Sequence, residues 1–166
     1  MWLQEQERVA ESEEPFRACC AEGDGYCCYN LGVALQDLDR FAEAEEPFRQ
    51  GCAILAESWA AGCSRNQPTQ CDEWAWCLLL EGRTAEAERA ERRAVAEKTS
   101  NAAYREVLGH ILMAQGRAGD ALAQFRRAVR LDASCARTIR GYLGLMERLY
   151  PEAVEAIDRV REELVP

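Results

Sequence analysis

Long apolar runs, an export signal and helix-breaking residues are scarce or missing in this chain. Its 166 residues contain no run of about 18 apolar residues, so we expect no membrane-spanning helix and no membrane partner. The opening residues, 1–8, have neither the basic flank nor the apolar stretch of a signal peptide, so we expect a cytoplasmic location for the chain as given. Only five prolines and eleven glycines occur, and alanine, glutamate, leucine and arginine dominate. This composition predicts an all-α protein.

Motifs that carry catalysis, nucleotide binding or zinc binding are also missing. The sequence contains no GxSxG, no GxGxxG, no Walker loop and no CxxC. His110 is the single histidine, so neither a catalytic triad nor a histidine-rich zinc site is expected. We therefore predict that the chain is not an enzyme, with no catalytic residues, no assigned metal site and no cofactor.

Negative charge dominates the first part of the chain. The net charge is −9, and residues 1–67 carry 13 acidic and 5 basic side chains. Because an acidic surface repels phosphate backbones, nucleic acid is excluded as the expected partner. A protein or peptide with basic residues fits this charge better.

Landmark residues recur with a period of 34. One unit contains Leu108, Gly109, Gly116, Ala121, Phe125 and Ala128. The places 34 residues earlier hold Trp74, Ala75, Gly82, Ala87, Glu91 and Ala94. The same spacing appears once more in Leu31, Gly32, Asp39, Ala44, Phe48 and Gly51, but 43 residues before the second unit. Small residues let two helices cross closely and phenylalanine fills the remaining gap, so each unit is predicted to be a helix, a turn and a second helix.

These landmarks resemble the tetratricopeptide repeat over about residues 25–135. The resemblance implies a short right-handed α–α superhelix, a solenoid of antiparallel helix pairs. We expect a single helical-repeat domain over residues 1–166. Its parts are a partial repeat at 2–24, repeat 1 at 25–58, an insertion at 59–67, repeat 2 at 68–101, repeat 3 at 102–135 and a capping helix pair at 136–166.

Three prolines bear on the predicted helix boundaries. Pro15 and Pro47 stand in equivalent places, since each follows a Glu-Glu pair and precedes Phe-Arg. Proline removes a donor and clashes with the preceding turn, so we expect these helices to begin at or kink near the proline. Pro151 suits the first turn of a final helix.

Cysteine is abundant, and its spacing is regular. The nine cysteines are Cys19, Cys20, Cys27, Cys28, Cys52, Cys63, Cys71, Cys77 and Cys135. A Cys-x7-Cys spacing occurs three times, each time across a predicted junction between two helices. Three interpretations stay open: reduced thiols packed as small apolar residues, one or more disulfides, or a metal or redox role for the cluster of the first four cysteines. A soft metal such as Zn or Cu(I) would suit that cluster.

The segment 16–32 resembles the cysteine-rich Sel-like repeat proteins, which are related to the tetratricopeptide repeat. In that family, Cys-x7-Cys followed by Tyr-Asn-Leu-Gly marks a disulfide-clamped helix pair. The resemblance implies the pairs Cys20 with Cys28 and Cys63 with Cys71. Such bridges require an oxidising compartment, and an odd number of cysteines leaves at least one thiol free.

The tetratricopeptide resemblance also implies a peptide groove lined by the first helix of each unit. Its positions fall on Tyr26, Tyr29, Val33, Gln36, Asp72, Trp76, Leu79, Glu106, His110 and Met113. The alternative is that several of these residues belong to ordinary helix faces. The subtype that grips acidic chaperone tails is excluded, because its basic places hold Tyr29, Val33, Glu73, Ala103 and Glu106.

Three functions follow as hypotheses. The first is a protein-interaction module that binds a peptide or protein segment as a scaffold, adaptor or chaperone. The second is a cysteine-rich thiol or metal-handling protein, or an assembly factor with structural disulfides. The third is a secretion chaperone. A short solenoid has two free ends, so self-association into a homo-oligomer is a further hypothesis.

Overall fold

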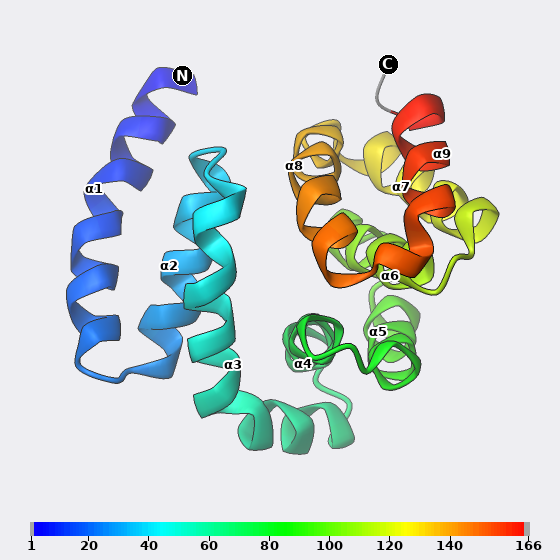
Figure 1. Ribbon diagram of the computed structural model, residues 1–166. Helices are drawn as coiled ribbons and strands as arrows, with labels where there is room; N and C mark the ends of the chain where they lie inside the picture. The colour runs from blue at the N-terminus through cyan, green and yellow to red at the C-terminus, as the bar shows by residue number, and fades with distance from the viewer. Residues whose placement is uncertain (1, 165–166) are drawn as a thin grey trace. The chain divides into compact units, whose positions relative to one another are not determined.

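The computed structural model describes the backbone of residues 2–164 and the side chains of residues 11–164, and all regular elements in this part are helical (Figure 1). The α-helices are α1 (Trp2–Ala21), α2 (Gly25–Asp37), α3 (Phe41–Ser64), α4 (Pro68–Leu80), α5 (Thr84–Glu97), α6 (Ala102–Ala114), α7 (Ala118–Leu131), α8 (Cys135–Leu149) and α9 (Val154–Leu164). A short 3₁₀ helix, η1 (Pro151–Ala153), precedes α9. The prediction of an all-α helical-repeat protein is confirmed.

The chain divides into two compact units. The first ends at Glu57 and holds α1, α2 and most of α3. The second begins at Ser58 and holds the end of α3 and helices α4 to α9.

In the first unit, α2 and α3 approach closely at small residues. A Cβ on Gly32 would lie 2.7 Å from the Phe48 ring, and a Cβ on Gly51 would lie 2.8 Å from the backbone nitrogen of Tyr29. The Asp24 side chain caps α2 by accepting a hydrogen bond from the Cys27 N–H at 2.9 Å. The small residue and phenylalanine of the repeat pattern therefore meet as the spacing predicts.

Helix α3 continues through most of the segment predicted as an insertion, residues 59–67. Its buried side chains recur at intervals of three or four residues through Phe48, Cys52, Leu55, Trp59 and Cys63. This periodicity is that of one uninterrupted helix with one buried stripe. The extra residues therefore lengthen α3 before the turn that leads to α4.

Neither α1 nor α3 begins at its proline. Pro15 lies inside α1, and Pro47 is the seventh residue of α3. Pro47 lacks an N–H, so the Glu43 carbonyl loses its usual helical donor, but the flanking turns remain helical. The buried stripe of α3 supplies a stabilisation that offsets this local cost. Pro151 stands in the first turn of η1, as predicted.

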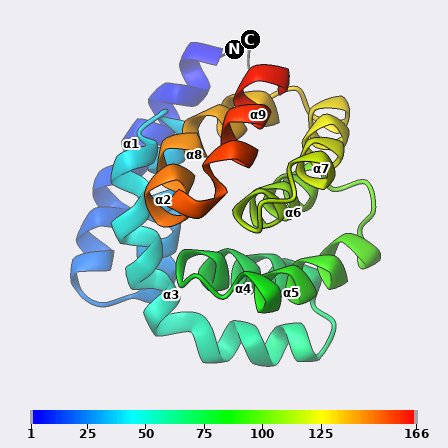
Figure 2. The same ribbon diagram turned by 45° about the vertical axis from the view of Figure 1, so that its right-hand side comes forward.

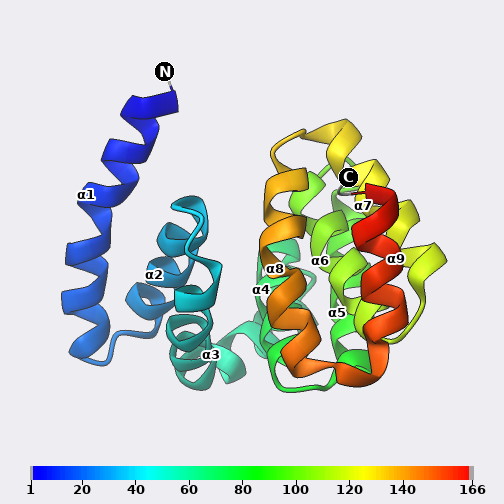
Figure 3. The same cartoon turned by 45° about the horizontal axis from the view of Figure 1, so that its top comes forward.

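In the second unit, the antiparallel pairs α4–α5 and α6–α7 follow one another (Figure 2). Glycine provides the left-handed turn in both pairs, with φ of 79° at Gly82 and 74° at Gly116. Helix α8 packs on α6, and α9 packs on both α7 and α8 (Figure 3). The Tyr150 hydroxyl, just after α8, donates a hydrogen bond to the Leu79 carbonyl at the end of α4. Helices α8 and α9, with Tyr150 between them, therefore pack against α4, α6 and α7.

Candidate functional site

The ten predicted groove residues lie on three helices. Helix α2 carries Tyr26, Tyr29, Val33 and Gln36; α4 carries Asp72, Trp76 and Leu79; α6 carries Glu106, His110 and Met113. Steps of three and four residues place each set along one side of its helix. The three sets differ in how far solvent reaches them.

The predicted residues of α2 form an accessible strip. Tyr26 is 50% exposed and Val33 is 37% exposed, and both are large apolar side chains. Tyr29 and Gln36 are half-buried, and the Tyr29 ring meets the Phe48 ring edge-on with centroids 5.0 Å apart. We call these four residues the α2 strip. It offers apolar contact area anchored on the packed Tyr29–Phe48 pair.

The predicted residues of α4 and α6 are mostly buried. Trp76 is 5% exposed, and Leu79, His110 and Met113 are 0% exposed. The Trp76 ring lies 4.9 Å from the Tyr142 ring of α8 and 6.2 Å from the His110 ring. His110 also meets the Phe125 ring at 5.0 Å. In this unit, the aromatic side chains expected in a groove form an aromatic cluster with Phe125 and Tyr142.

Two carboxyl groups face each other between α4 and α5. Asp72 belongs to the predicted groove, and Glu91 occupies the place that Phe48 and Phe125 hold in the other repeats. Neither Glu91 oxygen, nor Oδ1 of Asp72, accepts a hydrogen bond from an N–H or hydroxyl donor of the described residues. Two carboxylates have no donor to offer each other, so the pair is satisfied only when one of them keeps a proton.

Burial raises the pKa of both members of this pair. The pKa of Asp72 rises to about 7, because of burial and the nearby charges of Glu73 and Glu106, although a hydrogen bond with Glu91 opposes the rise. The pKa of Glu91 rises well above its ordinary value, chiefly through burial and then through the charge of Asp72. Because both pKa values are raised, the pair holds a proton at higher pH than two separate carboxyl groups would.

His110 and Cys135 are buried beside Glu106 and are unsuited to nucleophilic chemistry. The Nε2 atom of His110 lies 3.8 Å from Oε1 of Glu106, beyond hydrogen-bond distance. Burial, together with the neighbouring Glu106, raises the pKa of the Cys135 thiol to about 12. The Cys135 sulfur is therefore protonated at neutral pH, whereas a nucleophilic cysteine needs its thiolate.

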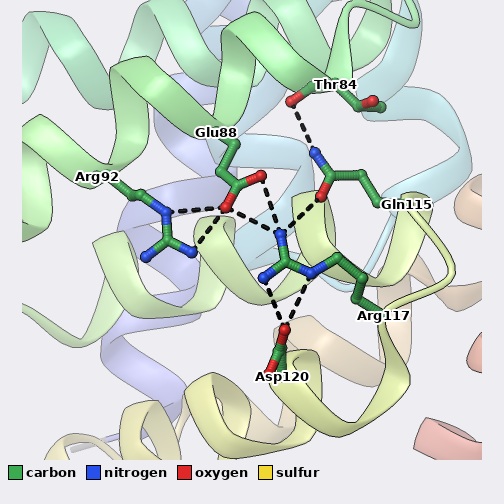
Figure 4. A network of polar contacts seen from close by, with 6 residues as sticks. All are labelled: Thr84, Glu88, Arg92, Gln115, Arg117 and Asp120. Atoms are coloured by element: carbon green, nitrogen blue, oxygen red, sulfur yellow. Dashed lines mark hydrogen bonds and ion pairs between the residues drawn. The ribbon is translucent and has the colours of Figure 1, made fainter.

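A polar network on the surface joins successive helix pairs (Figure 4). Glu88 of α5 binds Arg92 one turn later at 2.7 Å and Arg117 of the next pair at 3.0 Å. Arg117 also binds Asp120 at 2.7 Å, and the Gln115 amide donates to the Thr84 carbonyl at 3.2 Å. This network bridges α5 and the α6–α7 turn. Two of its contacts have a signal in the sequence, namely the spacing of four between Glu88 and Arg92 and the spacing of three between Arg117 and Asp120.

Cysteine bridges close two helix junctions. Cys20 is joined to Cys28 and Cys63 to Cys71, which are the pairs implied by the Sel-like resemblance. Cys19 is joined to Cys27 in addition, and Cys135 is a buried free thiol. The Sel-like resemblance does not imply this additional bridge, although Cys19 and Cys27 have the same Cys-x7-Cys spacing as the other two pairs.

Comparisons with known proteins identify two of the helix pairs. The models of the tetratricopeptide repeat match residues 26–57 and 102–135. A crystal structure of MamA is 16% identical, with 93% of this chain and 85% of that chain covered and a TM-score of 0.42. The "MamA 41-end" structure from Desulfovibrio magneticus RS-1 is 19% identical, with 97% and 92% covered and a TM-score of 0.44. No curated protein sequence matches the chain. Within residues 2–164, none of the helices has the length and apolar character needed to cross a bilayer.

Proposed function

Because this chain belongs to the tetratricopeptide-repeat superfamily, we propose that it binds a segment of another protein along the α2 strip. Tetratricopeptide repeats are protein-interaction modules, and the matched segment 26–57 begins at the first residue of this strip. The observation that carries the proposal is the exposure of Tyr26 and Val33, which are two helical turns apart on one side of α2. Tyrosine is among the residues that most often carry binding energy at protein interfaces, and Val33 adds apolar contact area beside it.

The charge around the strip favours a segment with basic residues. Residues 1–57 carry 13 acidic and 4 basic side chains. Asp24 at the start of α2 and Asp37 at its end flank the strip in sequence. A segment with apolar residues for the strip and lysine or arginine for its acidic border matches both features. In the second unit, two predicted groove residues, Trp76 and His110, are buried and pack against Tyr142 of α8.

Selection from a random-peptide display library tests this function. The full chain, with its bridges intact, is the bait, and the affinities of the selected peptides are measured by titration calorimetry. We expect peptides enriched in basic and apolar residues. The double substitution Tyr26→Ala and Val33→Ala is expected to weaken their binding at least tenfold, which corresponds to about 1.4 kcal/mol.

A matched control separates the strip from exposed apolar residues in general. Leu131 on α7 is 45% exposed and lies in the second unit, so Leu131→Ala is expected to leave the affinity unchanged. The proposal fails if no peptide is selected. It also fails if the selected peptides bind the double variant as tightly as the unsubstituted chain.

A further inference from the structure

The turn between α1 and α2 has one bridge more than its counterpart between α3 and α4. Cys19–Cys27 and Cys20–Cys28 both close the first turn, and Cys63–Cys71 alone closes the second. The two turns are in the same register, because the cap residues Asp24 and Gln67 each follow the first cysteine of the equivalent bridge by four residues. A single bridge is therefore enough to hold this kind of turn.

The positions of the additional bridge are filled differently at the second turn. In the common register, Cys19, Asp24 and Cys27 correspond to Gly62, Gln67 and Gln70. A Cβ on Gly62 would lie 1.2 Å from Oε1 of Gln70 and 2.8 Å from Oε1 of Gln67, so the two amide side chains occupy this space. The first turn thus replaces glycine and two neutral amides with two sulfur ligands and a carboxylate.

The three side chains of the first turn converge. The sulfur atoms of Cys19 and Cys27 and a carboxylate oxygen of Asp24 all lie within 4.8 Å of one another. In tetrahedral zinc sites with Zn–S bonds of about 2.3 Å, sulfur ligands lie roughly 3.8 Å apart. Small side-chain movements would bring the separated sulfur atoms and the carboxylate to that spacing.

The two bridges of this turn differ at one cysteine. Cys19, Cys20 and Cys27 are half-buried and Asp24 is exposed, whereas Cys28 is 1% exposed, so only the Cys19–Cys27 bridge has both of its cysteines within reach of solvent. An accessible disulfide is reached by reductants more readily than a buried one. Cys27 is also in the first turn of α2, where the helix N-terminus stabilises a thiolate.

We propose that reduction of the Cys19–Cys27 bridge creates a zinc site formed by Cys19, Cys27 and Asp24, while Cys20–Cys28 continues to hold the turn. Two thiolates and one carboxylate supply three ligands, and water takes the fourth position. The Cys20–Cys28 bridge keeps the three ligands preorganised after the Cys19–Cys27 bridge opens. This site uses residues outside the α2 strip, and its existence does not depend on peptide binding.

The reductant is a dithiol, and the electrons balance in two exchange steps. A thiolate of the dithiol attacks the Cys19 sulfur, and Cys27 leaves as a thiolate stabilised by the start of α2. The second thiol of the reductant then attacks the mixed disulfide and releases Cys19. The bridge has gained two electrons, and the dithiol has become an internal disulfide. Zn²⁺ then binds both sulfur atoms as thiolates, and any proton on them is released to solvent.

Graded reduction of the full chain with dithiothreitol tests the proposal. Alkylation and peptide mass spectrometry identify the cysteines that open at each step, and Zn²⁺ or Co²⁺ is titrated at each step after removal of the dithiol. We expect Cys19 and Cys27 to open first, followed by binding of one Zn²⁺ per chain. Co²⁺ should give the sulfur-to-cobalt charge-transfer absorption of a two-thiolate site.

Substitutions in the same loop assign the ligands. Replacing Cys19 and Cys27 with serine is expected to abolish the binding, and Asp24→Asn to weaken it at least tenfold while preserving the helix cap, since asparagine also caps helices. Glu22→Gln removes an equal charge from the same loop and is expected to leave the affinity unchanged. The proposal is overturned if another bridge opens first or if no zinc binds once both thiols are free. Zinc binding that survives the double serine variant, or that responds equally to Asp24→Asn and Glu22→Gln, also overturns it.

Discussion

Replacing Glu91 with glutamine is expected to make the second unit less sensitive to alkaline pH. Glu91 is 0% exposed and shares a proton with Asp72, whose pKa rises to about 7. In the folded chain both pKa values are raised, so the folded state binds more protons than the unfolded state does. The unfolding free energy therefore falls as pH rises. This stability is fully present below about pH 4, the ordinary pKa of an aspartate, and is lost as pH rises through about 7.

The magnitude is bounded by the rise in the pKa of Asp72. Moving that pKa from 3.8 to about 7 corresponds to a cost of up to about 4 kcal/mol at alkaline pH. Relaxation of the site reduces this value, so a loss of roughly 1–3 kcal/mol between pH 5 and pH 8.5 is expected. In the Glu91→Gln variant, the amide donates a hydrogen bond to the Asp72 carboxylate at every pH. The variant should therefore lose less stability over this range.

Urea unfolding at pH 5, 7 and 8.5 measures the effect, with bridges intact and with tryptophan fluorescence and far-UV circular dichroism recorded together. Glu155→Gln, which removes an exposed carboxylate from α9, is the matched control and should follow the unsubstituted chain. The expected result is a variant that gains stability relative to the unsubstituted chain mainly at pH 8.5. Parallel pH profiles for the unsubstituted chain and Glu91→Gln would refute the shared proton.

Two further predictions concern helix crossing and the polar network. Gly109→Ala places a Cβ 2.4 Å from the Phe125 ring, so urea unfolding should show a loss of about 1–3 kcal/mol, whereas Gly144→Ala, with open space around its Cβ, should gain up to about 1 kcal/mol. Equal effects of the two substitutions would contradict the close crossing of α6 and α7. Arg117→Ala removes half-exposed contacts to Glu88 and Asp120, so its cost should stay below about 1 kcal/mol and shrink in 1 M salt. A cost that is unchanged by salt would show that packing, rather than charge, dominates there.

The repeat pattern predicted the turns and close contacts because these depend on single residues at fixed places. Glycine at positions 82 and 116 adopts the left-handed conformation that ends a helix, and Gly32 and Gly109 each meet a phenylalanine ring. The end of α3 at Ser64 does not follow from the repeat pattern. The interval of 43 residues between repeats indicates extra length, but only the buried stripe through Trp59 and Cys63 shows that this length is helical.

The groove assignment illustrates what a family pattern leaves open. The pattern places Tyr29, Asp72 and Glu106 at one equivalent position, and Val33, Trp76 and His110 at the next. Their exposure depends on what packs over them, and Tyr142 of α8 contacts both Trp76 and His110. Tyr142 lies outside the three units that define the pattern. For this reason the burial of the aromatic residues could not be read from the repeat alone.

Two equivalent positions hold an aromatic pair in the first repeat and an acidic pair in the second repeat. In the first repeat the pair is Tyr29 and Phe48, whose rings meet edge-on and whose contact does not depend on protonation. In the second repeat the pair is Asp72 and Glu91, whose pKa values are both raised, so their contact depends on protonation. In the sequence, Glu91 is visible only as a glutamate where the other repeats have phenylalanine. Its coupling to Asp72, 19 residues earlier, is visible only in the structure. Because a packed aromatic pair fills this crossing without any proton, the acid pair adds a pH dependence to the α4–α5 contact that the Tyr29–Phe48 contact between α2 and α3 does not have.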